Sequence, residues 1–86
     1  GKVVEKITQI INDWDPIGFF PMAPKDEYIN EIKKISEFVY SNYNLQVHTL
    51  AHEINKIFAE SFGTDVYDED LEQCTIIAKT LLRVAK

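Results

Sequence analysis

The chain has 86 residues, of which 45% are hydrophobic and 27% are charged, a composition typical of one small globular domain rather than a disordered chain. Nine basic and fourteen acidic side chains give a net charge of −5, and the only arginine, Arg83, leaves no basic cluster of the kind that binds nucleic acid. No apolar run approaches the roughly 20 residues of a membrane span, and a lone cysteine, Cys74, fits a reducing compartment. We therefore expect a single cytoplasmic domain over residues 1–86 that binds neither nucleic acid nor membranes.

Residues 2–14 are predicted to form the first helix, because apolar side chains recur there at helical spacing. Pro16 is expected to end this helix, since the residue before a proline is pushed out of the helical conformation. The loop over residues 15–25 then combines three prolines and one glycine with the large apolar residues Ile17, Phe19, Phe20 and Met22. A solvated loop would not have this composition, so it is expected to fold over the core or to present an apolar patch to a partner.

The second helix is predicted to begin near residues 24–26. Pro24 suits a first helical position, and Asp26 and Glu27 suit a first turn that faces the positive end of the helix dipole. Its apolar stripe would begin with Tyr28, and the polar residues 41–44 would end it.

The third helix is predicted over residues 46–62, with Gly63 at the position where a glycine commonly follows a helix. Asp68 would cap the fourth helix, whose buried face would carry Cys74. Four helices with short connections predict an all-α, compact four-helix bundle-like domain with an ordered apolar loop between the first two helices.

The fourth helix is apolar most of the way round, with Ile76 roughly opposite its buried face and Val84 to one side. Such a helix is either central in its bundle or covered by a partner. Ile76 and Val84 are therefore a candidate surface for self-association.

The sequence contains no convincing metal or catalytic constellation. His48 and His52 are four residues apart, as metal-binding histidines can be, but they lack the glutamate of a zinc peptidase helix and are expected to be solvated. The acidic residues 65–70 lack the glycine of a calcium loop, and helix capping explains them. We expect no cofactor, no metal and no catalytic residue of these kinds.

The remaining cluster surrounds the loop between the first two helices. Its candidate binding residues are Trp14, Asp15, Pro16, Gly18, Phe19, Phe20, Asp26, Glu27 and Tyr28. The same residues also have a purely structural interpretation, in which Asp15 accepts hydrogen bonds from nearby backbone amides and Gly18 supplies a positive φ. Both interpretations stay open at the level of sequence.

The string Trp14-Asp15-Pro16-Ile17-Gly18, followed by Pro24 and by Asp26-Glu27-Tyr28, resembles the YugE-like family of small bacterial proteins. The resemblance covers nearly the whole chain. It implies a small, all-helical cytosolic protein and assigns no activity.

Three functions remain as hypotheses. The leading one is a non-enzymatic protein-binding or regulatory module, for which an immunity-type protein that neutralises a toxin is one concrete version. The second is a small hydrolase or ligand-binding protein that uses the carboxylates of Asp15, Asp26 and Glu27, provided that they share one cleft. The third is a structural homodimer formed through Ile76 and Val84.

Overall fold

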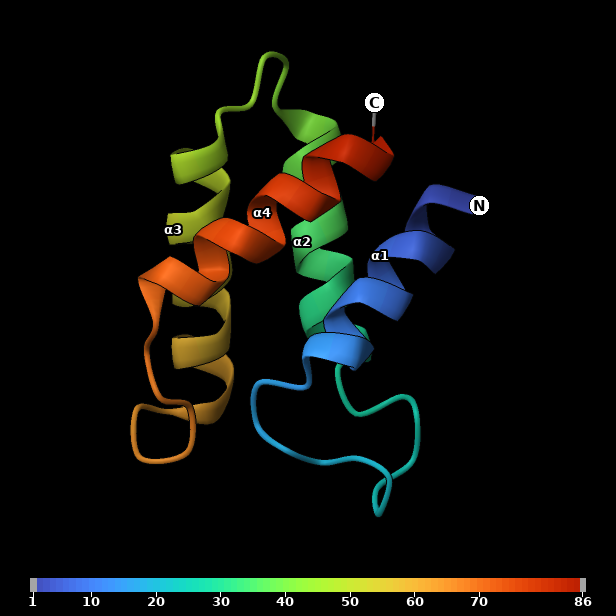
Figure 1. The fold of residues 1–86 in the computed structure, drawn as a ribbon, viewed down its shortest axis with the longest axis vertical. Coiled ribbons are helices and arrows are strands. Elements are labelled where there is room, and N and C mark those ends of the chain that lie inside the picture. The colour runs from blue at the N-terminus through green and yellow to red at the C-terminus, as the bar shows by residue number, and fades with distance from the viewer. Residues whose placement is uncertain (1, 86) are drawn as a thin grey trace.

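The computed structural model describes residues 2–85, which form four α-helices and no strand (Figure 1). These are α1 (Lys2–Trp14), α2 (Ile29–Ser41), α3 (Val47–Phe62) and α4 (Leu71–Ala85). The prediction of an all-α domain is confirmed, and the first and third helices lie within one residue of their predicted bounds. None of the helices in this part of the chain is long and apolar enough to cross a bilayer.

The helices pack in a closed cycle. Each packs on the next one along the chain, and α4 returns to pack against α1 as well as α3. Figure 1 shows α2 and α3 side by side, with α4 crossing in front of them. The bundle is therefore not a set of parallel rods, and each helix packs mainly against two others.

The core lies inside this cycle and draws on every helix. Its fully buried side chains belong mainly to the apolar stripes that the sequence predicts, because each stripe faces the centre of the cycle. They are Ile7, Ile11, Tyr28, Ile35, Leu50, Ala51, Ile54, Phe58, Tyr67, Cys74, Ala78 and Leu81.

The start of α2 differs from its prediction. The helix begins at Ile29 rather than near residues 24–26, because the preceding residues form a turn in which the Ile29 amide donates to the Asp26 carbonyl at 3.2 Å. The first full α-helical bond runs from the Ile32 amide to the Tyr28 carbonyl at 2.9 Å. Tyr28 therefore precedes the helix, and within the described residues no side chain, including that of Asp26, caps it.

The start of α4 also differs from its prediction. Asp70, and not Asp68, is the residue whose carboxylate accepts a hydrogen bond from the helix, through the Gln73 amide at 3.1 Å. The acidic run continues past Asp68 as an irregular connection, so the last acid before the helix takes the capping position.

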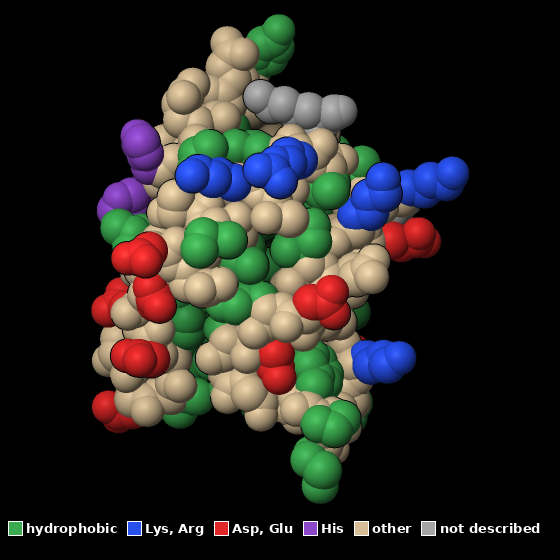
Figure 2. Space-filling view, in the orientation of Figure 1, with side chains coloured by type: hydrophobic (Ala, Val, Ile, Leu, Met, Phe, Trp, Pro, Cys, Tyr) green, Lys and Arg blue, Asp and Glu red, His purple; other side chains and the backbone are tan. Residues whose placement is uncertain are grey.

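Charges of both signs occur on the face shown in Figure 2. Most basic side chains lie over the end of α4 and the start of α1, whereas acidic ones gather at the α3 side and are also scattered over the rest of the face. Both histidines are exposed, as predicted.

Candidate functional site

Asp15 organises the loop between α1 and α2. It follows the last residue of α1 with a φ of 47°, in the left-handed region that Asp and Asn tolerate better than other non-glycine residues. Its carboxylate turns towards the loop, where Oδ1 accepts from the Phe19 amide at 2.8 Å and Oδ2 accepts from the Phe20 amide at 3.0 Å. The structural interpretation of Asp15 is confirmed, as is the positive φ of Gly18, which is 83°.

Tyr28 ties this loop to the core. Its hydroxyl donates to Asp15 Oδ1 at 2.6 Å and accepts from the Ile17 amide at 3.0 Å. Its buried ring packs against the rings of Phe19, Phe20, Phe58 and Phe62, with centroids separated by 5.4, 5.8, 5.7 and 6.1 Å. One side chain thus joins the loop to α3.

The protonation of this pair follows from its hydrogen bonds. Burial acts to raise the pKa of Asp15, but the hydrogen bonds from the Tyr28 hydroxyl and the loop amides outweigh it and hold the pKa below its usual value. Burial, together with the hydrogen bond to Asp15, raises the pKa of Tyr28 well above its ordinary value. Asp15 is therefore an anion and Tyr28 a neutral donor at neutral pH, which suits an anchor.

Most of the loop's aromatic surface faces inward. Trp14 meets Phe58 edge to face at 5.2 Å between ring centroids, and Phe19 meets Phe62 at 5.8 Å. The tip of the loop projects, and Met22 there is 93% exposed. Of the two arrangements expected for this loop, Ile17, Phe19 and Phe20 pack over the core, whereas Met22 is left as an exposed apolar side chain.

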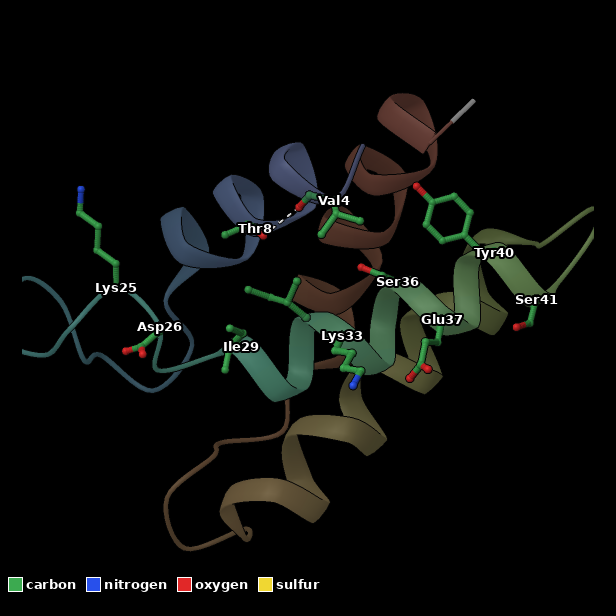
Figure 3. A pocket seen from close by; sticks show the side chains of 11 residues that line it. Val4, Thr8, Lys25, Asp26, Ile29, Lys33, Ser36, Glu37, Tyr40 and Ser41 are labelled. Carbon is green, nitrogen blue, oxygen red and sulfur yellow. Dashed lines mark hydrogen bonds between the residues drawn. The ribbon is translucent and has the colours of Figure 1, made fainter. Parts of the chain in front are cut away.

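A groove lies between α1 and α2 (Figure 3). It has a volume of about 800 Å³. Its apolar walls are Val4 on α1 and Ile29, Ile32 and Tyr40 on α2, and Figure 3 shows Val4 facing the α2 side chains across the gap. Ile29 and Tyr40 are 60% and 61% exposed, so large apolar surfaces border the groove.

Ser36 is the unusual residue of this groove. It is only 6% exposed, and its hydroxyl has no hydrogen-bond partner within residues 2–85. Thr8 on the opposite wall differs, since its hydroxyl donates to the Val4 carbonyl at 2.8 Å. A buried hydroxyl without a partner is costly and rare in folded proteins, and Figure 3 shows that of Ser36 directed into the space between the helices.

Charged side chains of both signs flank the groove. Lys25 and Asp26 lie at one end, and Lys33 and Glu37 lie along α2. Asp26 therefore faces the groove, whereas Asp15 is engaged by the loop amides, and Glu27 is exposed and does not line the groove. The carboxylates that the sequence grouped together thus occupy different surroundings.

The other singled-out residues lie away from this groove. On α4, Ile76 is 52% exposed and Val84 is half-buried. Cys74 is buried as predicted, with its sulfur 3.2 Å from the Tyr67 hydroxyl, and burial raises the pKa of its thiol. Among the described residues, no group of three or more potential ligands could hold a metal ion.

Sequence reasoning missed the groove. The signal was present in α2, where Ile29, Ile32, Ser36 and Tyr40 follow one another at spacings of three or four residues. This second stripe lies beside the core stripe of Tyr28, Ile32 and Ile35, so the helix has apolar side chains over two adjoining faces.

The chain was compared with protein families, curated proteins and solved structures. A family model described as a domain of unknown function, DUF1871, matches residues 6–86. No curated protein and no solved structure gave a match.

Proposed function

The chain belongs to the DUF1871 family of domains of unknown function, and from its geometry we propose that it is a non-enzymatic protein-binding module whose binding surface is the α1–α2 groove. The observation that carries this proposal is the exposure of two large apolar side chains, Ile29 and Tyr40, along this groove. A groove of about 800 Å³ falls within the range of ligand-binding sites, and such sites place a few polar groups in mostly apolar walls.

The groove supports binding better than the loop does. Phe19 and Phe20 pack against Tyr28, so their rings are engaged in the core. They could contact a partner only if the core opened. The groove side chains Ile29 and Tyr40 already face solvent and could be covered without any rearrangement.

Binding also fits better than acid–base catalysis by Asp15 and Asp26. Both carboxylate oxygens of Asp15 accept hydrogen bonds from the loop amides, and one accepts a further bond from Tyr28. A general acid needs a raised pKa near the working pH, whereas the hydrogen bonds of Asp15 lower its pKa.

Site-specific photo-crosslinking tests the proposal. A benzophenone side chain would replace either Tyr40, at the groove, or Tyr43, which is 88% exposed and does not line it. In cells that produce the protein naturally, we expect a discrete protein adduct from position 40 and none from position 43.

Matched isoleucine variants locate the contact. Ile29→Glu places a charge in the groove and should abolish the adduct, because a charge is costly in an apolar interface. Ile76→Glu, at a similarly exposed isoleucine on α4, should leave it intact. An adduct that depends on Ile76 and not on Ile29 would contradict the proposal, and an adduct of twice the chain mass would favour the homodimer.

Three more specific expectations from the sequence accompany this proposal. An immunity-type role would make the partner a toxin, and the YugE-like resemblance and a cytoplasmic location are consistent with such a module. All three stay predictions.

A further inference from the structure

Two histidines on α3 form a small site apart from the α1–α2 groove. We infer that His48 and His52 together bind one divalent transition-metal ion of the Zn²⁺, Ni²⁺ and Cu²⁺ class, through one ring nitrogen each, with water in the remaining coordination positions. This inference goes beyond the proposed function and does not depend on it. The spacing of the two side chains, their exposure and the charge around them carry it.

The helix brings the two imidazoles to one side. His48 and His52 lie four residues apart within α3, which is continuous over Val47–Phe62. Side chains at this spacing share a helix face, with Cβ atoms about 5–6 Å apart. Two nitrogens that bind one tetrahedral Zn²⁺ at about 2.0–2.1 Å are about 3.4 Å from each other. Rings on neighbouring turns reach this separation by rotating about their side-chain bonds, so the backbone need not change.

Both histidines are accessible to an ion from solvent. Their side chains are exposed, whereas Leu50 and Ala51, which lie between them in the sequence, are buried in the core. Figure 2 shows both histidines at the edge of the molecule on the α3 side. An ion with its shell of water can therefore reach both rings without any opening of the fold.

The charge of the surroundings favours a cation. The chain carries −5, and acidic side chains gather at the α3 side in Figure 2. Such a field attracts a divalent cation. Lys56, one turn after His52, opposes this attraction, but it is exposed and its flexible stem can extend into solvent.

The ligands select the class of ion. Imidazole suits Zn²⁺, Ni²⁺ and Cu²⁺, whereas Mg²⁺ and Ca²⁺ prefer oxygen ligands. The pair is not the catalytic zinc helix considered above, because Thr49 follows His48 where that helix carries a glutamate that acts as a base. The site is therefore one for binding, without a reaction.

Isothermal titration calorimetry with Ni²⁺ on the untagged chain tests the inference. His52→Ala removes one ligand. A double variant, Thr49→His with His52→Ala, keeps two histidines but places them at adjacent positions, where side chains point about 100° apart and do not face each other. Because Thr49 is exposed, this double variant is a matched control with the same number of imidazoles.

We expect the wild-type protein to bind one Ni²⁺ per chain. Both variants should bind it at least about tenfold more weakly, because the second ligand on the same face acts at a high effective concentration. Mg²⁺ in excess should not compete with Ni²⁺, since it prefers oxygen ligands.

Three results would overturn the inference. Equal affinity of the wild-type protein and the double variant would show that the spacing of the histidines does not matter. Equal affinity of the wild-type protein and His52→Ala would place the ion elsewhere. A ratio of one ion to two chains would exclude the open coordination, because the ligands would then come from two copies.

Discussion

The carboxylate of Asp15 accepts three hydrogen bonds, from the Phe19 and Phe20 amides and from the Tyr28 hydroxyl. Hydrogen bonds to charged groups contribute about 1.5–3 kcal/mol each, and ordering a loop residue costs about 1–2 kcal/mol. Three such bonds therefore offset most of the cost of ordering the six residues from Asp15 to Phe20.

This anchor makes stability depend on pH. The pKa of Asp15 is lower in the folded protein than its ordinary value, so the folded state binds fewer protons and gains stability from Asp15 above the unfolded pKa of about 3.9. That contribution should disappear as the pH falls below about 4 and through the lowered folded pKa. Urea unfolding between pH 2 and pH 6 would measure it.

Asp15→Asn is the matched variant for this measurement, because Asn also tolerates the left-handed backbone but cannot carry the charge. We expect it to lose about 1–3 kcal/mol at pH 7 and to show a weaker fall in stability below pH 4 than the wild-type protein. Identical pH profiles would show that Asp15 does not carry the effect.

For Ser36 we expect the opposite effect, a gain of stability when the side-chain polar group is removed. Ser36→Ala removes a buried hydroxyl that has no partner in the described structure and replaces it with the best helix former, so the free protein should gain about 1–2 kcal/mol. Ser61→Ala, on the exposed side of α3, should gain only a few tenths of a kcal/mol from helix propensity. Chemical denaturation of both variants would decide, and a loss of stability in Ser36→Ala would mean that its hydroxyl is already satisfied.

At the scale of elements, the α1–α2 connection is divided into an anchored part and a free tip. The amides of Ile17, Phe19 and Phe20 donate to side chains, and the Ala23 amide donates to the Phe19 carbonyl at 2.9 Å. Met22 projects at the tip. The loop is therefore a structured cover for the core with a small exposed apolar point.

Amide hydrogen exchange tests this division. We expect slow exchange at Ile17, Phe19 and Phe20 and fast exchange at Met22, because exchange requires the hydrogen bond to open. Asp15→Asn should accelerate exchange at Phe19 and Phe20 while Ile54 on α3 keeps its protection. Fast exchange throughout residues 16–23 of the wild-type protein would refute the anchored loop.

At the scale of the whole molecule, the closed cycle of helices concentrates stability in one core. Ile54 is fully buried in it, whereas His52 on the same helix is exposed. Ile54→Ala should cost about 2–5 kcal/mol through lost burial and the cavity left behind. His52→Ala should change the free energy of unfolding by less than about 0.5 kcal/mol. Denaturant titrations of the two variants would measure both effects. Equal losses would contradict the placement of Ile54 on the buried face of α3 and of His52 on its exposed face.

The sequence by itself determined the four helices, their buried faces and the turn at Asp15. These features depend on local rules: helical spacing of apolar residues, the restriction before Pro16, and the ability of Asp15 to accept bonds from amides a few residues ahead. The start of α2 was misplaced because a turn at residues 26–29 precedes it, and Tyr28 at the end of this turn is bonded to Asp15, thirteen residues earlier, a contact that is not local.

Only the tertiary structure decided which apolar residues stay uncovered. The sequence places Ile29, Ser36 and Tyr40 on one side of α2, but their exposure depends on where α1 lies. Because α1 packs against both α2 and α4, it leaves an open groove along α2 with Ser36 on its floor. The positions of neighbouring helices follow from the summed packing of the whole core, so a pattern within one helix cannot determine them.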